Sequence, residues 1–171
     1  MIDAQDMVKV HTTGYDLEEV KIILNHDIKL NISEIEIEGK QGEMLNVPRW
    51  ISQVLESENH AKLQDIDMLV ELKQATVKEN VQGEEHLSTL DPHFYIRLKS
   101  YMKTLLPQDF DKIESMLITL VRKRQGKIVR LADSSKLTAN LSQKLTIEER
   151  LFYENIYKNA TDFRKQILGD K

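Results

Sequence analysis

The chain contains no cysteine, and this absence removes several kinds of chemistry at once. A protein without cysteine has no disulfide framework, no thiolate metal site and no cysteine nucleophile. The sequence also holds no apolar run near the roughly 18 residues that a membrane-spanning helix needs, and residues 1–10 show no basic flank leading into an apolar stretch. We therefore expect a cytoplasmic protein with no membrane contact.

Phosphate-binding loops are missing as well. None of the six glycines lies in a loop that ends in Lys-Ser or Lys-Thr, and their spacing does not fit a dinucleotide-binding fingerprint. The five histidines include no helical pair three or four residues apart, which is the spacing that favours a zinc site. We predict that the protein binds no cofactor and no metal.

Two acidic pairs could in principle serve a metal-dependent enzyme. They are Asp65 with Asp67, and Asp109 with Asp111. Each pair stands at the start of a predicted helix, where carboxylates complement the positive end of the helix dipole. The pattern therefore favours helix caps over a catalytic site.

The 171 residues are 40% hydrophobic and 30% charged, which is typical of a folded protein with an apolar core. The net charge of −4 is unevenly spread. Residues 1–60 carry five basic residues against twelve acidic ones, whereas the remainder carries 19 against 16. Such a division indicates either two units that face different partners or simply solvated surface.

Residues 1–60 are predicted to form a small β-rich domain. Apolar residues alternate in Glu18–Leu24 and again from Ile28 to Ile32, as expected for strands with one buried face. The alternation slips at Ser33–Glu34, which predicts a bulge or a tight bend. Gly39–Gly42 is typical of a hairpin turn, with Met44–Val47 as the returning strand.

A short helix is expected to close this domain. Pro48 suits the first position of a helix, because its missing N–H costs nothing there. Ile51, Val54 and Leu55 then form an apolar stripe, and Trp50 is expected to join the core. We predict that Pro48, Trp50 and Leu55 pack this domain.

Residues 61–171 are predicted to form a helical bundle domain, so that the whole chain is of the α+β class. The first helix is expected to end near Asn80, with an inward face made by Leu63, Ile66, Val70 and Val77.

Three further helices are indicated by their start signals. Asp91 followed by Pro92 opens the second, Asp109 caps the long third helix, and Thr146 with Glu149 forms a capping box for the last. Their inward positions include Phe94, Leu98, Ile113, Leu120, Ile128, Leu151, Ile156, Tyr157, Phe163 and Ile167.

A basic cluster stands out on the third helix: Arg122, Lys123, Arg124, Lys127 and Arg130. At 100° per residue, Lys123, Lys127 and Arg130 would share one face, while Arg124 lies at the edge of the apolar stripe. Such a basic ridge is compatible with a solvated face, a phosphate-contacting surface or a partner interface.

Several short motifs, spread from residue 47 to residue 153, resemble those of a known family. The segment 124–128 with Leu131-Ala132, the later segment 145–153, the pair Phe94-Tyr95, and Val47-Pro48 leading into Trp50 are similar to motifs of GINS subunits. The order of the parts, with the small domain first, resembles one of the two classes of archaeal GINS subunit. The sequence departs from the family's pattern at Gly126. Glycine inside a helix costs about 1 kcal/mol of helix stability relative to alanine.

The resemblance implies a non-catalytic scaffold of the replicative DNA helicase, located in the cytoplasm with the nucleoid. It implies a 2:2 heterotetramer with a second GINS subunit type, and contacts with the minichromosome maintenance helicase, a RecJ-like protein, and primase or DNA polymerase. A nucleic-acid-binding module that uses the basic ridge is the alternative, and only weak DNA contact is expected.

Candidate site residues follow from the third helix. Its apolar positions wrap widely enough that one side should pack in the bundle and another against a second subunit. We predict that Arg124 pairs with a carboxylate at this interface, with Lys127 as a looser contact. The predicted interface comprises Arg124, Lys127, Ile128, Leu120, Phe94 and Tyr95, and the predicted DNA contacts are Arg122, Lys123 and Arg130.

Overall fold

The structure is a computed structural model that describes residues 4–32, 34–64 and 67–169. Contacts between Cα atoms divide the chain into two units, Met1–Ile66 and Asp67–Lys171, which are described separately. A small β-rich region precedes a helical domain, so the α+β class expected from the sequence is confirmed.

The first unit combines two helices with five short strands. The three-stranded antiparallel sheet has the order β4-β1-β5, and β2 pairs with β3 in a separate two-stranded ribbon. In chain order the elements are α1 (Ala4–Leu17), β1 (Glu19–Leu24), β2 (Ile28–Ile32), β3 (Ile35–Gly39), β4 (Met44–Pro48), α2 (Arg49–Ser57) and β5 (Ala61–Leu63).

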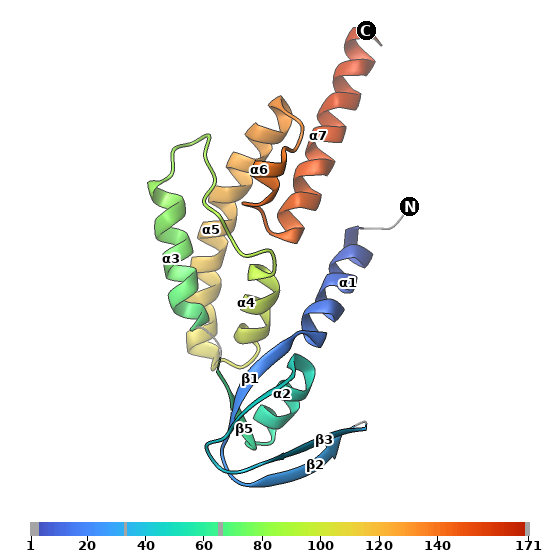
Figure 1. The fold of residues 1–171 in the computed structure, drawn as a ribbon. Coiled ribbons are helices and arrows are strands. Elements are labelled where there is room, and N and C mark those ends of the chain that lie inside the picture. The colour runs from blue at the N-terminus through green and yellow to red at the C-terminus, as the bar shows by residue number, and fades with distance from the viewer. Residues whose placement is uncertain (1–3, 33, 65–66, 170–171) are drawn as a thin grey trace. The chain divides into compact units, whose positions relative to one another are not determined.

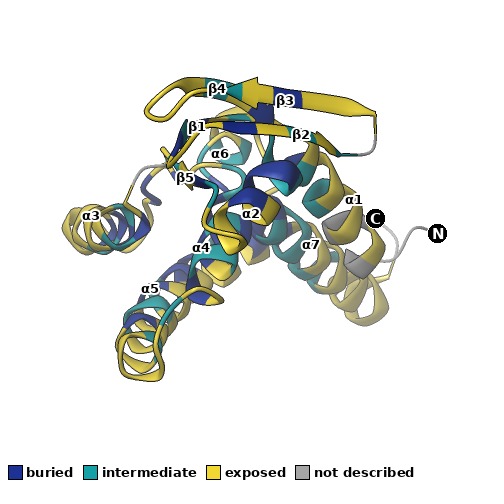
Figure 2. Cartoon of the chain, turned by 90° about the horizontal axis from the view of Figure 1, so that it is seen from below, coloured by how far each residue is buried: buried dark blue, intermediate teal, exposed yellow. Residues whose placement is uncertain are grey.

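The core of this unit forms where the alternating strand residues meet α2. Ile22 and Leu24 of β1 are buried with Ile51 and Leu55 of α2, and Trp50 packs against this cluster from a partly exposed position. Figure 2 shows buried, dark blue stretches on α2, whereas the β2–β3 ribbon is largely yellow. Leu55 is thus part of the core of this unit, and Trp50 lies at its edge.

Two details of α2 differ from the prediction. Pro48 is the last residue of β4 and the N-cap of α2, with φ −54° and ψ 141°, instead of the first helical residue. Val54 is 43% exposed, because the helix is covered on one side only and Val54 lies beyond that side.

The predicted hairpin at Gly39–Gly42 is wrong. β3 pairs with β2 and β4 pairs with β1, so this segment carries the chain from the ribbon to the sheet. Gly39 packs so closely that a Cβ atom there would lie 2.7 Å from Cδ1 of Leu24, and Gly42 has a φ of +79°.

The hairpin instead lies where the alternation slips. Ile32 is opposite Ile35 in the β2–β3 ribbon, and Glu34, which precedes Ile35, has a φ of 73°. Ser33 lies outside the described residues. The helix α1 (Ala4–Leu17) was not predicted from the sequence.

The second unit is a helical bundle built around one long helix. Its elements are α3 (Met68–Val81), α4 (Phe94–Met102), α5 (Pro107–Ser134), α6 (Ala139–Ser142) and α7 (Ile147–Leu168). α5 packs against α3 and runs beside α7 (Figure 1). One core cluster joins α3, α4 and the first half of α5, and a second joins the end of α5 to α7.

Several helix starts follow the predicted chemistry. The carboxylate of Asp67 caps α3 by accepting hydrogen bonds from the N–H groups of Leu69 and Val70, while Asp65 lies outside the described residues. The capping box of Thr146 and Glu149 is present at the start of α7. These local signals are confirmed.

Two starts are displaced from the predicted ones. α5 begins at Pro107, so Asp109 lies in its first turn and is not the cap. Asp91 accepts a hydrogen bond from the N–H of His93, and α4 begins at Phe94 after that turn.

The predicted inward face of α3 is wrong. Met68, Leu72, Ala75 and Glu79 are buried, whereas Val70 and Val77 are 43% and 60% exposed. Of the other two predicted residues, Leu63 belongs to β5, where it is opposite Ile22 of β1, and Ile66 lies outside the described residues.

The end of α7 also differs from the expectation of an inward apolar face. Phe163 and Ile167 are 63% and 68% exposed. Gly126, by contrast, does not interrupt α5, and no atom within 4 Å would meet a Cβ atom there.

Candidate functional site

Four charged side chains lie buried at the centre of the helical unit. Arg124 and Lys127 come from α5, Glu79 from α3 and Glu149 from α7, and all four are buried. Two cations and two anions make this cluster, which we term the ion network, neutral overall. Buried charges in proteins are expected to be paired in this way.

Arg124 is the centre of the ion network. Its Nε and one terminal nitrogen donate to the two carboxylate oxygens of Glu149 at 2.7 and 2.8 Å, and its other terminal nitrogen donates to Glu79 Oε2 at 2.7 Å. Further bonds reach the backbone oxygens of Ser88 and Lys144. The bidentate geometry matches the fork of a guanidinium to a carboxylate.

Lys127 forms the second branch. Its ammonium group donates to Glu79 Oε1 at 2.6 Å and to the backbone oxygen of His86 at 2.9 Å. Glu79 therefore receives one cation on each oxygen, and it ties α3 to two consecutive turns of α5.

Neutral groups complete the ion network. Ser88 donates to Glu79 Oε2 from both its N–H and its hydroxyl group, at 3.1 and 2.6 Å. The hydroxyl of Tyr95 donates to Glu149 Oε1 at 2.8 Å, and the N–H of Thr146 donates to Glu149 Oε2 at 3.1 Å. One connected set of bonds thus joins α3, α4, α5, α7 and the loop between α3 and α4.

The environment keeps these groups in the protonation states that the bonds require. Burial alone would raise the pKa of Glu79, but hydrogen bonds from Lys127 and Ser88 and the charge of Arg124 outweigh it, so the pKa lies below its ordinary value. Burial also opposes the charge of Arg124, yet Glu149 holds the pKa of Arg124 above its ordinary value. Burial and the charge of Glu149 raise the pKa of Tyr95, so its hydroxyl remains a donor.

The structure places the predicted interface residues inside the chain. Arg124 does pair with a carboxylate bidentately, but that carboxylate is Glu149 of the same chain. Arg124 is 0% exposed, and Lys127, Ile128, Leu120 and Phe94 are also buried, so a partner would not reach these side chains. Of the six residues, Tyr95 and Ile128 line a surface hollow.

The basic ridge does not form as predicted. Lys127 turns inward, and it interrupts the line between Lys123 and Arg130. Lys123 donates to Asn80 Oδ1 at 2.8 Å, and Arg130 pairs with Glu84. Of the five basic residues on this stretch, Arg122, Lys123 and Arg130 remain at least partly exposed.

Glu79 is the functional residue that the sequence analysis missed. A signal for it exists, because Met68, Leu72, Ala75 and Glu79 follow the spacing of one helical face, which puts a carboxylate in line with buried apolar residues. Glu149 was predicted only as part of a capping box. The structure gives its carboxylate a second role as the main partner of Arg124.

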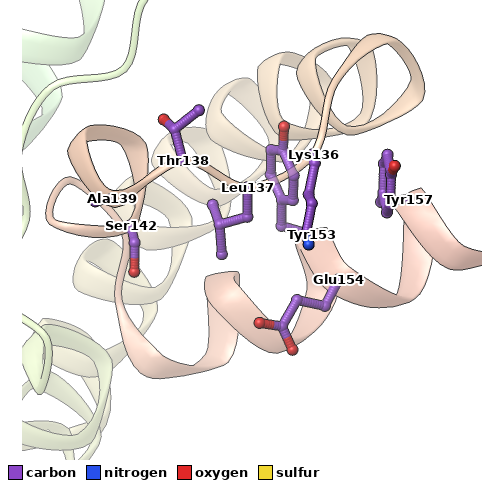
Figure 3. Close-up of a pocket in the computed structure, with 8 residues that line it drawn as sticks. All are labelled: Lys136, Leu137, Thr138, Ala139, Ser142, Tyr153, Glu154 and Tyr157. Carbon is purple, nitrogen blue, oxygen red and sulfur yellow. The ribbon is translucent and has the colours of Figure 1, made fainter.

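Two surface hollows adjoin α7. One, of about 330 Å³, lies between α7 and the segment Lys136–Ser142, and Tyr153, Glu154 and Tyr157 line it (Figure 3). The other, which we term the Glu148 groove, has about 360 Å³ and lies between α4, α5 and α7. Its lining includes Tyr95, Lys99, Leu117, Val121, Gln125, Glu148 and Phe152.

Two histidines of the first unit lie close together. His26 and His60, which are far apart in the sequence, approach to 2.8 Å between ring nitrogens. No group of three or more histidine, cysteine or acidic side chains in the described ranges could hold a metal ion. Among the described helices, none has the length and apolar character to cross a bilayer.

Comparison with known proteins identifies the bundle. The family model described as Sld5, the GINS complex protein helical bundle domain, matches residues 49–168. The match includes every charged residue of the ion network. No curated protein gives a significant match to the chain.

Proposed function

The chain belongs to the GINS family, and we propose that it is a non-catalytic scaffold subunit of a GINS complex in the replicative DNA helicase. The family match over residues 49–168 is the observation that carries this proposal. The charged groups buried in the bundle support it, because Arg124, Lys127, Glu79 and Glu149 are bonded to one another and leave no free nucleophile or base among them.

The order of the two units indicates which class of GINS subunit the chain represents. A β-rich unit precedes the helical one here, and we assign the chain to the archaeal class in which the small domain comes first. In that class it would form a 2:2 heterotetramer with a second GINS subunit type. Its proposed further partners are the minichromosome maintenance helicase, a RecJ-like protein, and primase or DNA polymerase, in the cytoplasm at the nucleoid.

Exposed apolar side chains support assembly with another chain. The C-terminal part of α7 exposes Phe163, Ile167 and Leu168, and the middle of α5 exposes Ile118 and Val129. Exposed large apolar side chains of this kind are often found at protein interfaces. A scaffold that is completed by its partners accounts for these residues.

Co-expression with the second GINS subunit type tests the proposal. Purification through one tagged subunit, followed by measurement of the assembly mass, should give two copies of each chain. A chain that remains monomeric at micromolar concentration in the presence of every candidate subunit would contradict the proposed function.

DNA binding is retained only as a weak accessory contact through Arg122, Lys123 and Arg130. Phosphate contacts make affinity fall steeply with salt, so a titration of duplex DNA against salt concentration measures their share. Sub-micromolar binding by the isolated chain at physiological salt would instead favour a nucleic-acid-binding module.

A further inference from the structure

Two imidazole rings meet at the surface of the first unit. His26 lies between β1 and β2, and His60 lies between α2 and β5. Nε2 of His26 is 2.8 Å from Nδ1 of His60, with the ring centroids 5.0 Å apart and the ring planes at 69°. His26 is exposed and His60 is half-buried, so dissolved ions can reach the pair.

The backbone holds both histidines in place where β1 pairs with β5. The N–H of Asn25 donates to the backbone oxygen of His60 at 2.9 Å, and the side-chain amide of Asn25 donates to the backbone oxygen of Asn59 at 3.0 Å. The N–H of His60 donates to the backbone oxygen of Leu55 at 2.7 Å. These hydrogen bonds bring the rings together without using a ring nitrogen, so the two nitrogens are positioned in advance.

The separation of the two ring nitrogens is the one that a metal ion requires. An ion binds imidazole nitrogen at about 2.0 Å, so two ligands at a right angle lie about 2.8 Å apart. Such angles belong to the square-planar and tetragonal coordination that Cu²⁺ and Ni²⁺ adopt with nitrogen ligands. The tetrahedral coordination of Zn²⁺ would place the two nitrogens about 3.3 Å apart.

The exchange of a hydrogen bond for an ion balances without loss of a proton. Without an ion, one ring donates its N–H to the unprotonated nitrogen of the other ring. A metal ion takes the place of that hydrogen. The ring that donated then carries its proton on its other nitrogen, so both rings stay neutral and each offers a lone pair to the ion.

The charge of this part of the chain also favours a cation. Residues 1–60 carry twelve acidic residues against five basic ones. An excess of negative charge raises the local concentration of cations at the surface. The histidine pair is therefore open, positioned in advance and set in a unit that attracts positive ions.

We propose that His26 and His60 together bind one divalent transition-metal ion, and that Cu²⁺ is preferred over both Ni²⁺ and Zn²⁺. The two imidazoles take neighbouring positions around the ion, and water molecules complete its coordination. The bound ion links the β1–β2 connection to the α2–β5 connection and thereby stabilises the first unit. This inference concerns the first unit alone and does not depend on the proposed function.

Titration of the full chain with Cu²⁺, without a histidine tag, tests the inference. We expect saturable binding of one ion per chain. The variants His26→Gln and His60→Gln should each weaken binding by about tenfold or more, because two linked ligands bind more tightly than one. The melting temperature of the original chain should rise with the concentration of the ion, and it should rise less in either variant.

Electron paramagnetic resonance of the original chain with Cu²⁺ gives a readout that needs no variant. The spectrum should show coupling to two imidazole nitrogens. His86→Gln provides the matched control, because His86 is an exposed histidine of the second unit. This control should leave the affinity for Cu²⁺ unchanged.

Four outcomes would overturn the inference. The first is an affinity for Cu²⁺ that neither His26→Gln nor His60→Gln lowers, because binding would then lie at other groups. The second is a spectrum with coupling to a single nitrogen. The third is tighter binding of Zn²⁺ than of Cu²⁺. The fourth is no saturable binding of any of the three ions up to about 1 mM, which would leave the pair as a hydrogen bond only.

Discussion

Replacing Arg124 with methionine should cost the helical unit a large part of its stability. The substitution keeps a long apolar stem in the core but removes every hydrogen bond that the guanidinium donates. Glu79 retains Lys127 and Ser88, whereas Glu149 retains only the hydroxyl of Tyr95 and the N–H of Thr146. Glu149 is therefore the carboxylate that would be left buried without a positively charged partner.

The size of the loss follows from that charge. Removing one partner of a buried ion pair costs about 3–5 kcal/mol, against a total of about 5–15 kcal/mol for a typical domain. Replacing the unpaired carboxylate of Glu149 with a neutral amide should recover part of the lost unfolding free energy. In the double variant Arg124→Met with Glu149→Gln, the amide oxygen still accepts from Tyr95, and the remaining charges, Glu79 and Lys127, still pair.

A double-mutant cycle measures this effect. Urea unfolding of the original chain, the two single variants and the double variant, followed by circular dichroism, gives the four free energies of unfolding. We expect the double variant to be more stable than Arg124→Met alone, with a coupling of about 0.5–3 kcal/mol. Additive losses, within about 0.5 kcal/mol, would refute the direct pairing of Arg124 with Glu149.

Three further outcomes are expected. The pKa of Glu79 lies below its ordinary 4.5, so the stability that its charge contributes is complete above pH 4.5 and is lost as the pH falls through the lower pKa of the folded state. The variant Glu79→Gln should therefore lose less unfolding free energy at acid pH than the original chain. Urea unfolding at a series of pH values measures this difference. Lys123→Ala and Arg130→Ala should each change the unfolding free energy by less than about 1 kcal/mol, and greater losses would contradict their surface placement. Phe163→Ser combined with Ile167→Ser should weaken assembly with the second subunit, measured by sedimentation, without lowering the melting temperature of the isolated chain.

The features that the sequence predicted well are local ones. The cap at Asp67 and the capping box at Thr146 and Glu149 depend on residues within one turn, so neighbouring letters are enough to specify them. The alternation of Ile22 and Leu24 likewise gave the buried face of β1. In each case the pattern that carries the prediction lies within a few neighbouring residues.

Strand pairing was not predictable in the same way. The glycines at positions 39 and 42 suit a hairpin, but the register depends on which distant strand is free to pair, and β1 takes both β4 and β5 as neighbours. Once β1 is occupied in this way, β2 and β3 have only each other. The glycines then serve a close approach to Leu24 and a backbone of positive φ.

The basic residues of α5 show why charge spacing alone could not locate the site. The helix α5 packs against both α3 and α7. More of its circumference is therefore buried than in a helix that packs on one side only. Lys127 shares its face with Lys123 and Arg130 by spacing, yet Glu79 draws it inward. To predict that Lys127 is buried, one must know which face of α3 points inward. The apolar Val70 and Val77, which are exposed, indicated the wrong face.

The same pairing bears on what the bundle can bind. Arg124 and Lys127 are neutralised inside the chain, and Arg130 is paired with Glu84 at the surface, so this part of α5 offers fewer free cations than its sequence suggests. Phosphate binding scales with the number of available cations, and this number is small here. The pairing of these cations therefore argues against a large phosphate-binding surface on this part of α5.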